Sequence, residues 1–198
     1  MTLPNKLTLL RILMIPVMVI LYYIPVLHEH FLFDRLPLAF VLAGSVFVLA
    51  SLTDFLDGYL ARKLNLITTF GKFADPLADK ILVMAALLIL ADAQIVASWV
   101  IIVILAREFI VSGIRLVVLE RKDENKKVIA ANKLGKYKTV MTMLAIIFLF
   151  FTVNLDSAEG VQVLKITGDV LIYLSLVLTI VSGIEYFWQN KEAILESI

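Results

Sequence analysis

The segment from Thr53 to Lys80 reads TDFLDGYLARKLNLITTFGKFADPLADK and contains four aspartates in two pairs. Asp54 and Asp57 form the first pair, and Asp75 and Asp79 form the second. At 100° of rotation per residue, the members of a pair lie about 60° and about 40° apart on a helix. Because each pair shares one helical face, two helices that meet through these faces bring four carboxylates together.

Four neighbouring carboxylates predict a site for hard metal ions. They cannot all stay ionised without cations, and an oxygen-only ligand set suits Mg²⁺, Mn²⁺ or Ca²⁺. Magnesium takes substrate phosphates as further ligands, so paired metals indicate phosphoryl chemistry. On the same stripe, Gly58 and Ala61 leave room for a ligand, and Arg62 can bind a phosphate. A glycine here is also compatible with close helix packing alone.

The composition predicts an all-α integral membrane protein. Of the 198 residues, 61% are hydrophobic and 18% are charged, with a net charge of +1. Soluble domains carry about 25% charged residues, so a soluble globule is excluded. The balanced charge gives no sign of nucleic-acid binding. The chain contains no cysteine, which excludes disulfides, thiolate metal sites and thiol catalysis.

Apolar segments predict a six-transmembrane-helix bundle within a single domain, residues 1–198. We expect the spans at Leu7–Leu27, Leu38–Arg62, Pro76–Asp92, Ser98–Leu119, Thr139–Leu155 and Val170–Phe187. Most lysines and arginines fall on one side of these spans, while the opposite loops hold only Arg35 and Lys165. By the positive-inside rule, both termini and the four aspartates face the cytosol, and the protein lies in the cytoplasmic membrane.

The fourth predicted span carries a second polar stripe. Its members fall within about 140° of one another on an otherwise apolar helix; they are Arg107, Glu108, Ser112 and Arg115. Two arginines on one face can bind a phosphate, with Glu108 orienting them. The alternative is a structural ion pair between either arginine and Glu108 or a carboxylate of another helix.

Other polar residues of neighbouring segments are candidates to complete this phosphate site. They are Asn5, Thr8 and Arg11 near the start of the chain, and Lys133, Lys136 and Lys138 before the fifth span. Each lysine is equally compatible with a contact to anionic lipid or with a topology signal. His28 and His30 fall in a predicted outer loop, where we expect solvated residues rather than catalysts.

The spacing Asp54-x2-Asp57-Gly58-x2-Ala61-Arg62-x8-Gly71-x3-Asp75-x3-Asp79 resembles the motif of the CDP-alcohol phosphotransferase family at every fixed position. The resemblance extends over most of the chain. Its further blocks are PNKLTLLRI (4–12), REFIVSGIRL (107–116) and KLGKYKT (133–139), which resemble bacterial members that use glycerol 3-phosphate. The motif is more specific than these blocks, so it indicates the reaction class more firmly than the acceptor.

The resemblance implies a homodimer among membrane lipids that transfers a phosphatidyl group from CDP-diacylglycerol to sn-glycerol 3-phosphate and releases CMP. It implies that Asp54, Asp57 and Asp75 hold two divalent cations, Mg²⁺ or Mn²⁺. Asp79 would complete the second metal site and act as the general base on the acceptor hydroxyl. The residues implied to line the CDP pocket are Thr53, Gly58, Ala61, Arg62, Gly71 and Lys72.

Other readings stay open at this point. The same chemistry could use phosphatidylglycerol, giving cardiolipin, or serine or an inositol phosphate, although two arginines favour an acceptor that carries a phosphate. An ion- or proton-coupled transporter predicts charges near the membrane midplane and inverted repeats. This chain has its charges toward one leaflet and no repeat. A prenyl-diphosphate enzyme requires aspartate clusters with a different spacing.

Overall fold

The computed structural model describes residues 3–32, 35–64, 69–120, 133–153 and 159–191. Within these ranges, side chains are not described at 3–4, 55–64, 69–73, 115–120, 133–134, 136 and 159–162. The helices are α1 (Leu3–Tyr23), α2 (Pro25–Glu29), α3 (Leu38–Leu64), α4 (Thr69–Asp92), α5 (Ser98–Glu120), α6 (Lys133–Phe151) and α7 (Glu159–Gln189). The strands are β1 (Phe31–Leu32) and β2 (Leu36–Pro37).

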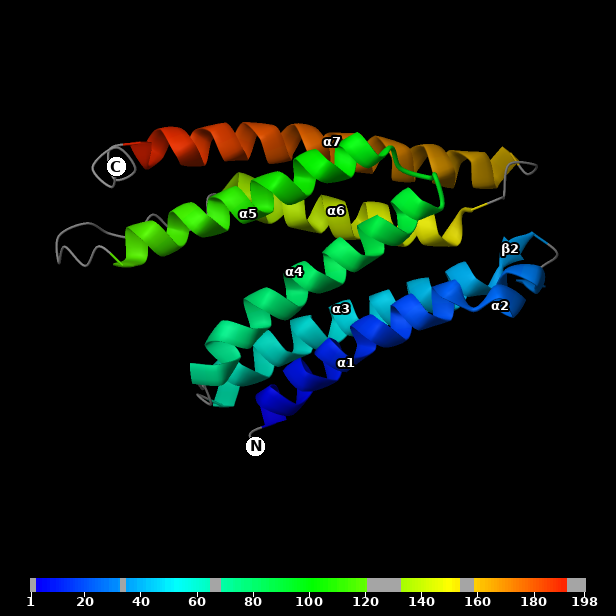
Figure 1. Cartoon of the computed structure of the whole chain (residues 1–198), viewed down its shortest axis with the longest axis horizontal. Coiled ribbons are helices and arrows are strands. Elements are labelled where there is room, and N and C mark those ends of the chain that lie inside the picture. Colours follow the sequence, from blue (N-terminus) through cyan, green and yellow to red (C-terminus); the bar gives the residue numbers. More distant parts are fainter. Residues whose placement is uncertain (1–2, 33–34, 65–68, 121–132, 154–158, 192–198) are drawn as a thin grey trace.

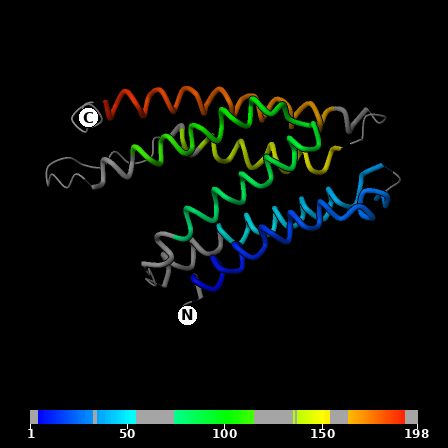
Figure 2. The backbone as a smooth tube through the Cα atoms, in the orientation of Figure 1, coloured from blue at the N-terminus to red at the C-terminus, as the bar shows by residue number. Residues whose placement is uncertain are grey.

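The long helices run alternately in opposite directions along one bundle (Figures 1 and 2). One half pairs α1 with α3, and the other packs α7 against α6 and α5. Helix α4 packs mainly on α1 and also contacts α3, α5 and α6, and α3 contacts α6, so the two halves are joined. As a result, the start of α1, the junction of α3 with α4 and the end of α7 lie at the same end of the molecule (Figure 1).

The first predicted span ends earlier than expected. Helix α1 stops at Tyr23, and Ile24 adopts an extended conformation with φ −73° and ψ 113° before Pro25 begins α2. Proline disfavours a helical conformation in the residue before it and lacks an N–H donor, which explains the break. The loop predicted after this span contains an antiparallel pair, with Phe31 opposite Pro37.

Several helices extend beyond the apolar segments that predicted them. Helix α4 begins at Thr69 rather than at Pro76, and α7 begins at Glu159 rather than at Val170. Hydropathy marks only the apolar part of a helix, whereas polar turns that continue it carry no such mark. Helix α6 instead ends at Phe151, short of the predicted Leu155.

The outer surface of the bundle is strongly apolar. Ile102, Phe109 and Trp188 are each between 64% and 69% exposed. Stretches 5–23 and 163–189 are long and apolar enough to cross a membrane, and shorter apolar stretches lie at 38–54 and 137–151. Soluble monomers rarely expose apolar patches of more than a few hundred Å². The chain is therefore a mostly helical membrane protein.

A small residue allows the two halves of the bundle to approach closely. A Cβ atom placed at Gly44 of α3 would lie 2.9 Å from the Cβ of Phe150 on α6. Phe150 is fully buried, as are Phe47 and Leu82 beside it in the core. Close packing at small residues is a usual way for membrane helices to associate. This contact fixes α3, and the aspartates at its end, relative to α6.

Candidate active site

Helix α1 contacts two of the motif aspartates, which lie on two other helices. The guanidinium Nη1 of Arg11 lies 2.8 Å from Oδ1 of Asp54 on α3. The hydroxyl of Thr8, one turn earlier on α1, donates a hydrogen bond of 2.5 Å to Oδ1 of Asp75 on α4. Arg11 and Thr8 are both fully buried. The carboxylates of α3 and α4 are therefore held against one face of α1.

Asp79 lies one turn beyond Asp75 on α4. It is within electrostatic range of two acidic residues, Asp54 and Glu108, and of the cations Arg11 and Lys138. Its Oδ1 atom is buried and accepts no hydrogen bond from the described residues. A buried carboxylate oxygen without a donor is costly, so this atom fits contact with a cation or with a hydroxyl of a bound molecule.

The oxygen donors present fit a divalent metal ion, although the described part of the site is incomplete. No group of three acidic or histidine side chains capable of holding a metal occurs among the described residues. The side chain of Asp57, which is needed for the predicted set, lies outside them. Each carboxylate has two oxygens. Asp54 and Asp75 can therefore keep their contacts with α1 and still offer an oxygen to a cation.

The residues predicted for the CDP pocket lie where α3 ends and α4 begins. Thr53 is the one whose side chain is described, and its hydroxyl donates to the carbonyl oxygen of Ala50 at 2.6 Å. The other five lie on the backbone of these two helices, with side chains outside the described set: Gly58, Ala61, Arg62, Gly71 and Lys72.

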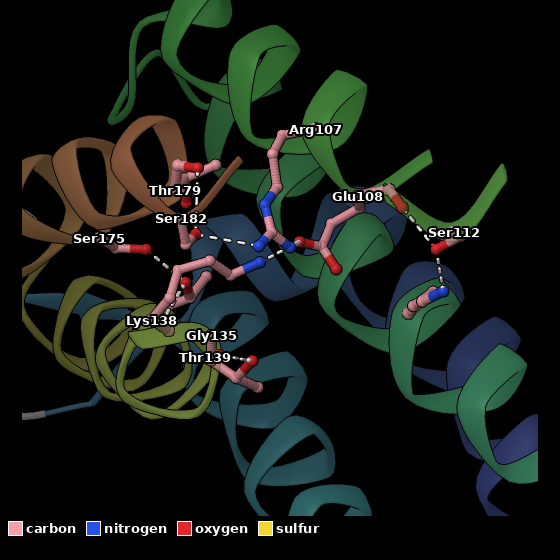
Figure 3. A network of polar contacts seen from close by, with 11 residues as sticks. Arg107, Glu108, Ser112, Gly135, Lys138, Thr139, Ser175, Thr179 and Ser182 are labelled. Carbon is pink, nitrogen blue, oxygen red and sulfur yellow. Dashed lines mark hydrogen bonds and ion pairs between the residues drawn. The ribbon is translucent and has the colours of Figure 1, made fainter. Parts of the chain in front are cut away.

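A polar network connects α5, α6 and α7 (Figure 3). Glu108 accepts hydrogen bonds from Arg107 Nη1, at 3.1 Å, and from Lys138 Nζ of α6. Arg107 Nη2 also donates to Ser182 Oγ of α7 at 2.9 Å. Arg107 thus forms an ion pair with Glu108, which the sequence analysis gave as the alternative to binding a phosphate. The same pair brings Arg107 and Lys138, both predicted to bind the acceptor phosphate, to one carboxylate.

Two neighbouring cavities open beside this network. The first, of about 150 Å³, is lined by α4, α5, α6 and α7, and its polar lining includes Arg107, Ser182 and Glu185. The second, of about 250 Å³, has mainly apolar walls but contains Asp79. Lys80, Glu108, Lys138 and Thr139 line both cavities. The proposed base and the proposed phosphate site are therefore adjacent.

Some predicted phosphate ligands lie elsewhere or outside the described side chains. Thr8 and Arg11 contact the motif carboxylates and do not occur among the residues that line either cavity. The side chains of Arg115, Lys133 and Lys136 lie outside the described residues.

The histidines lie at the other end of the bundle from the aspartates. His28 is only half exposed, because its Nε2 lies 2.6 Å from the carbonyl oxygen of Tyr22 and its ring packs against Tyr22 and Phe40. His28 thus lies in α2 and not in a loop as predicted, while the expectation that it is not a catalyst stays a prediction. His30 is exposed, and its carbonyl oxygen accepts a hydrogen bond from Leu38.

Among the cavity residues that the sequence analysis missed are Lys80, Ser182 and Glu185. Lys80 follows Asp79 directly, and its charge inside a predicted span was the feature that could have identified it. Glu185 carries the same signal in the last predicted span, whereas Ser182 reaches the cavity only through the packing of α7 against α5.

Comparison with known proteins shows the family to which the chain belongs. The family model described as CDP-alcohol phosphatidyltransferase matches residues 1–181. The chain belongs to the CDP-alcohol phosphotransferase family. It is 43% identical over 202 aligned residues to the CDP-diacylglycerol–glycerol-3-phosphate 3-phosphatidyltransferase of Bacillus subtilis (strain 168), covering 98% of each chain. Proteins of the same name from Rickettsia typhi and Haemophilus influenzae are 40% and 35% identical, over 93% and 98% of this chain and 94% and 96% of theirs.

Proposed function

We propose that this protein transfers the phosphatidyl group of CDP-diacylglycerol to sn-glycerol 3-phosphate, giving phosphatidylglycerophosphate and CMP. The observation that carries the proposal is the pair of adjoining cavities, one with Asp79 and the other with Arg107, which share Lys138. A hydroxyl acceptor that carries a phosphate needs both a base and cations. The name shared by the relatives describes the same reaction.

Two divalent cations, Mg²⁺ or Mn²⁺, belong to the proposed site. The CDP-alcohol phosphotransferase family generally uses divalent metal ions. Asp54, Asp57, Asp75 and Asp79 would hold them, and the bound ions would neutralise the diphosphate and the departing CMP. The buried Asp79 oxygen without a described hydrogen-bond donor supports this assignment.

The chain's own residues perform the other tasks of the reaction. Asp79 accepts the proton of the acceptor hydroxyl as that oxygen attacks the phosphorus attached to diacylglycerol. The new bond joins this oxygen to phosphorus, and the bond from phosphorus to the CMP oxygen breaks in line with it. Arg107 and Lys138 hold the acceptor phosphate and so position the hydroxyl. No covalent enzyme intermediate is required.

The CDP moiety of the donor is assigned to the end of α3 and the start of α4. This assignment follows the family motif and involves Thr53, Gly58, Ala61, Arg62, Gly71 and Lys72. Donor and acceptor would then be held by different helices, because Arg107 and Lys138 lie on α5 and α6.

The placement in the membrane is also a proposal. The long helices span the cytoplasmic membrane as one domain of six spans, with both termini and the active site toward the cytosol. Their alternating directions and the basic residues Lys6 and Arg11 near the start of α1 support this orientation (Figure 1). A homodimer is proposed from the family resemblance.

The acceptor can be tested with purified protein, CDP-diacylglycerol, Mg²⁺ and a panel of labelled acceptors. The panel contains glycerol 3-phosphate, phosphatidylglycerol, serine and inositol phosphate, and the lipid product and CMP are measured for each. We expect phosphatidylglycerophosphate from glycerol 3-phosphate at a much higher kcat/KM than any product from the other acceptors. Preferential formation of cardiolipin, phosphatidylserine or an inositol lipid would replace the proposed acceptor.

A further inference from the structure

We propose that Lys80 is a further cation for the phosphate of the acceptor, and that Ser112 holds its amine in position. The inference rests on the proposed function, because it concerns how the same site selects a phosphorylated acceptor. Neither residue belongs to the family motif as it stands in this sequence.

Lys80 lies where the cavity that contains the proposed base meets the cavity proposed for the acceptor phosphate. It follows Asp79 on α4, about 100° further round the helix. Its side chain is half-buried and lines both the cavity that contains Asp79 and the cavity that contains Arg107. A ligand that occupies both cavities would therefore contact Lys80.

The charges around the first cavity distinguish Lys80 from its neighbours. Arg107 and Lys138 both form ion pairs with Glu108. The polar partner of Lys80 among the described residues is a neutral hydroxyl, Ser112 Oγ, at 2.5 Å. A cation inside a membrane bundle without a counter-charge is costly, and an anionic ligand removes that cost. Lys80 therefore adds to Arg107 and Lys138 a cation that forms no ion pair among the described residues.

Ser112 is oriented to hold this amine. Its hydroxyl donates a hydrogen bond of 2.5 Å to the backbone carbonyl of Glu108 on the same helix (Figure 3). Its lone pairs can therefore accept a hydrogen bond from Lys80. A serine hydroxyl has one proton, and a lysine ammonium has three donors. After one donor goes to Ser112, two remain for a ligand.

Binding of the acceptor phosphate at Lys80 would also position the acceptor hydroxyl for the transfer step. A phosphate on Lys80 lies beside the residue that accepts the proton, because Asp79 and Lys80 both line the second cavity. The anchored phosphate then limits where the acceptor hydroxyl can reach, which lowers the entropic part of the barrier. Removal of the Lys80 charge should therefore impair use of glycerol 3-phosphate much more than donor binding.

The test compares Lys80→Met, which keeps the length of the side chain but removes its charge, with Lys80→Arg and Ser112→Ala. Lys191→Met is the matched control, since Lys191 is exposed, lies 5.3 Å from the Trp188 ring and lines neither cavity. For each protein we would measure KM for glycerol 3-phosphate, KM for CDP-diacylglycerol, and inhibition of the reaction by inorganic phosphate.

We expect Lys80→Met to raise KM for glycerol 3-phosphate by about tenfold to hundredfold, the range of a lost hydrogen bond to a charged group. Inhibition by inorganic phosphate should weaken in parallel, while KM for the donor and the control variant stay near wild type. Lys80→Arg should recover part of the loss, and Ser112→Ala should show the same pattern more weakly.

An unchanged KM for glycerol 3-phosphate in Lys80→Met, or a larger rise in KM for the donor, would overturn the inference. If Lys80→Met does not fold, the ratio of the two KM changes in Ser112→Ala decides the question in the same way. Failure of the wild-type protein to use glycerol 3-phosphate would instead contradict the proposed function, so the two failures are distinguishable.

Discussion

Arg11 and Thr8 lie one turn apart on α1 and contact different aspartates, Asp54 and Asp75. Arg11 is fully buried, whereas the side chain of Asp54 is 41% exposed, so the pair holds a buried cation against a carboxylate that still reaches the site. Charged groups buried in this way are stable only with close partners. The two contacts therefore fix the direction of both carboxylates before any ligand binds.

The first prediction at this scale is a strict need for a divalent cation. Asp54→Asn, Asp57→Asn and Asp75→Asn should each abolish turnover while the protein still inserts into the membrane, since an amide offers one neutral oxygen in place of a carboxylate. Activity measured against added Mg²⁺ or Mn²⁺ after treatment with a chelator checks this. Full activity in excess chelator would show that the carboxylates have another role.

Arg107→Ala provides the second prediction. Arg107 contacts both Glu108 and Ser182 at the cavity proposed for the acceptor. The variant should weaken use of glycerol 3-phosphate by about 1.5–3 kcal/mol, the value of a hydrogen bond to a charged group. Steady-state kinetics with each substrate varied in turn measures it. An acceptor KM and rate equal to wild type would leave Arg107 with its ion pair alone.

The helices that carry the aspartates could be predicted from the sequence, whereas the contacts of the aspartates with other helices could not. The motif spacing predicted that α3 and α4 carry the aspartates, because rotation along a helix follows from residue number. The partners of those aspartates on α1 could not be predicted, since nothing in the local sequence shows that Thr8 and Arg11 pack there. Ser182 was missed for the same reason, because it reaches the cavity only through the contact between α7 and α5.

At the scale of the elements, the contact of α3 with α6 depends on Gly44. Addition of a methyl group in Gly44→Ala would place it 2.9 Å from the Cβ of Phe150, an atom that moves only with its helix. Overpacking of this kind costs about 1–3 kcal/mol. We expect a lower midpoint of thermal unfolding for this variant in detergent.

Gly113→Ala on α5 is the matched control. A Cβ at Gly113 meets no atom within 4 Å, so the change should be neutral or should stabilise the helix by up to about 1 kcal/mol. Equal midpoints for the two variants would show that the close approach of α3 to α6 does not limit stability.

The boundaries of the elements were less predictable than their existence. The apolar segments correctly predicted six long helices among the described residues. Their ends were displaced where polar turns continue a helix, as at Thr69, or where a proline interrupts it, as at Pro25. The short pair β1–β2 has only two residues in each strand, which is too few for a recognisable hydropathy pattern.

At the scale of the whole molecule, the bundle separates an apolar exterior from a polar end. Exposed side chains such as Ile102 and Trp188 face outward along the helices, whereas Asp79 and Arg107 line interior cavities. A lipid donor and a water-soluble acceptor can therefore meet at one site, with the acyl chains remaining in the membrane. This separation is what a transfer between the two phases requires.

Direct transfer with Asp79 as the base can be tested through the balance of products that the purified protein makes from CDP-diacylglycerol and glycerol 3-phosphate. CMP and phosphatidylglycerophosphate are quantified together in the presence of Mg²⁺, with the acceptor omitted in one arm and Asp79→Asn in another. We expect equal amounts of the two products, no CMP without acceptor, and an Asp79→Asn variant that binds the donor but does not turn over. CMP release without acceptor, or normal turnover by Asp79→Asn, would contradict direct transfer with Asp79 as the base.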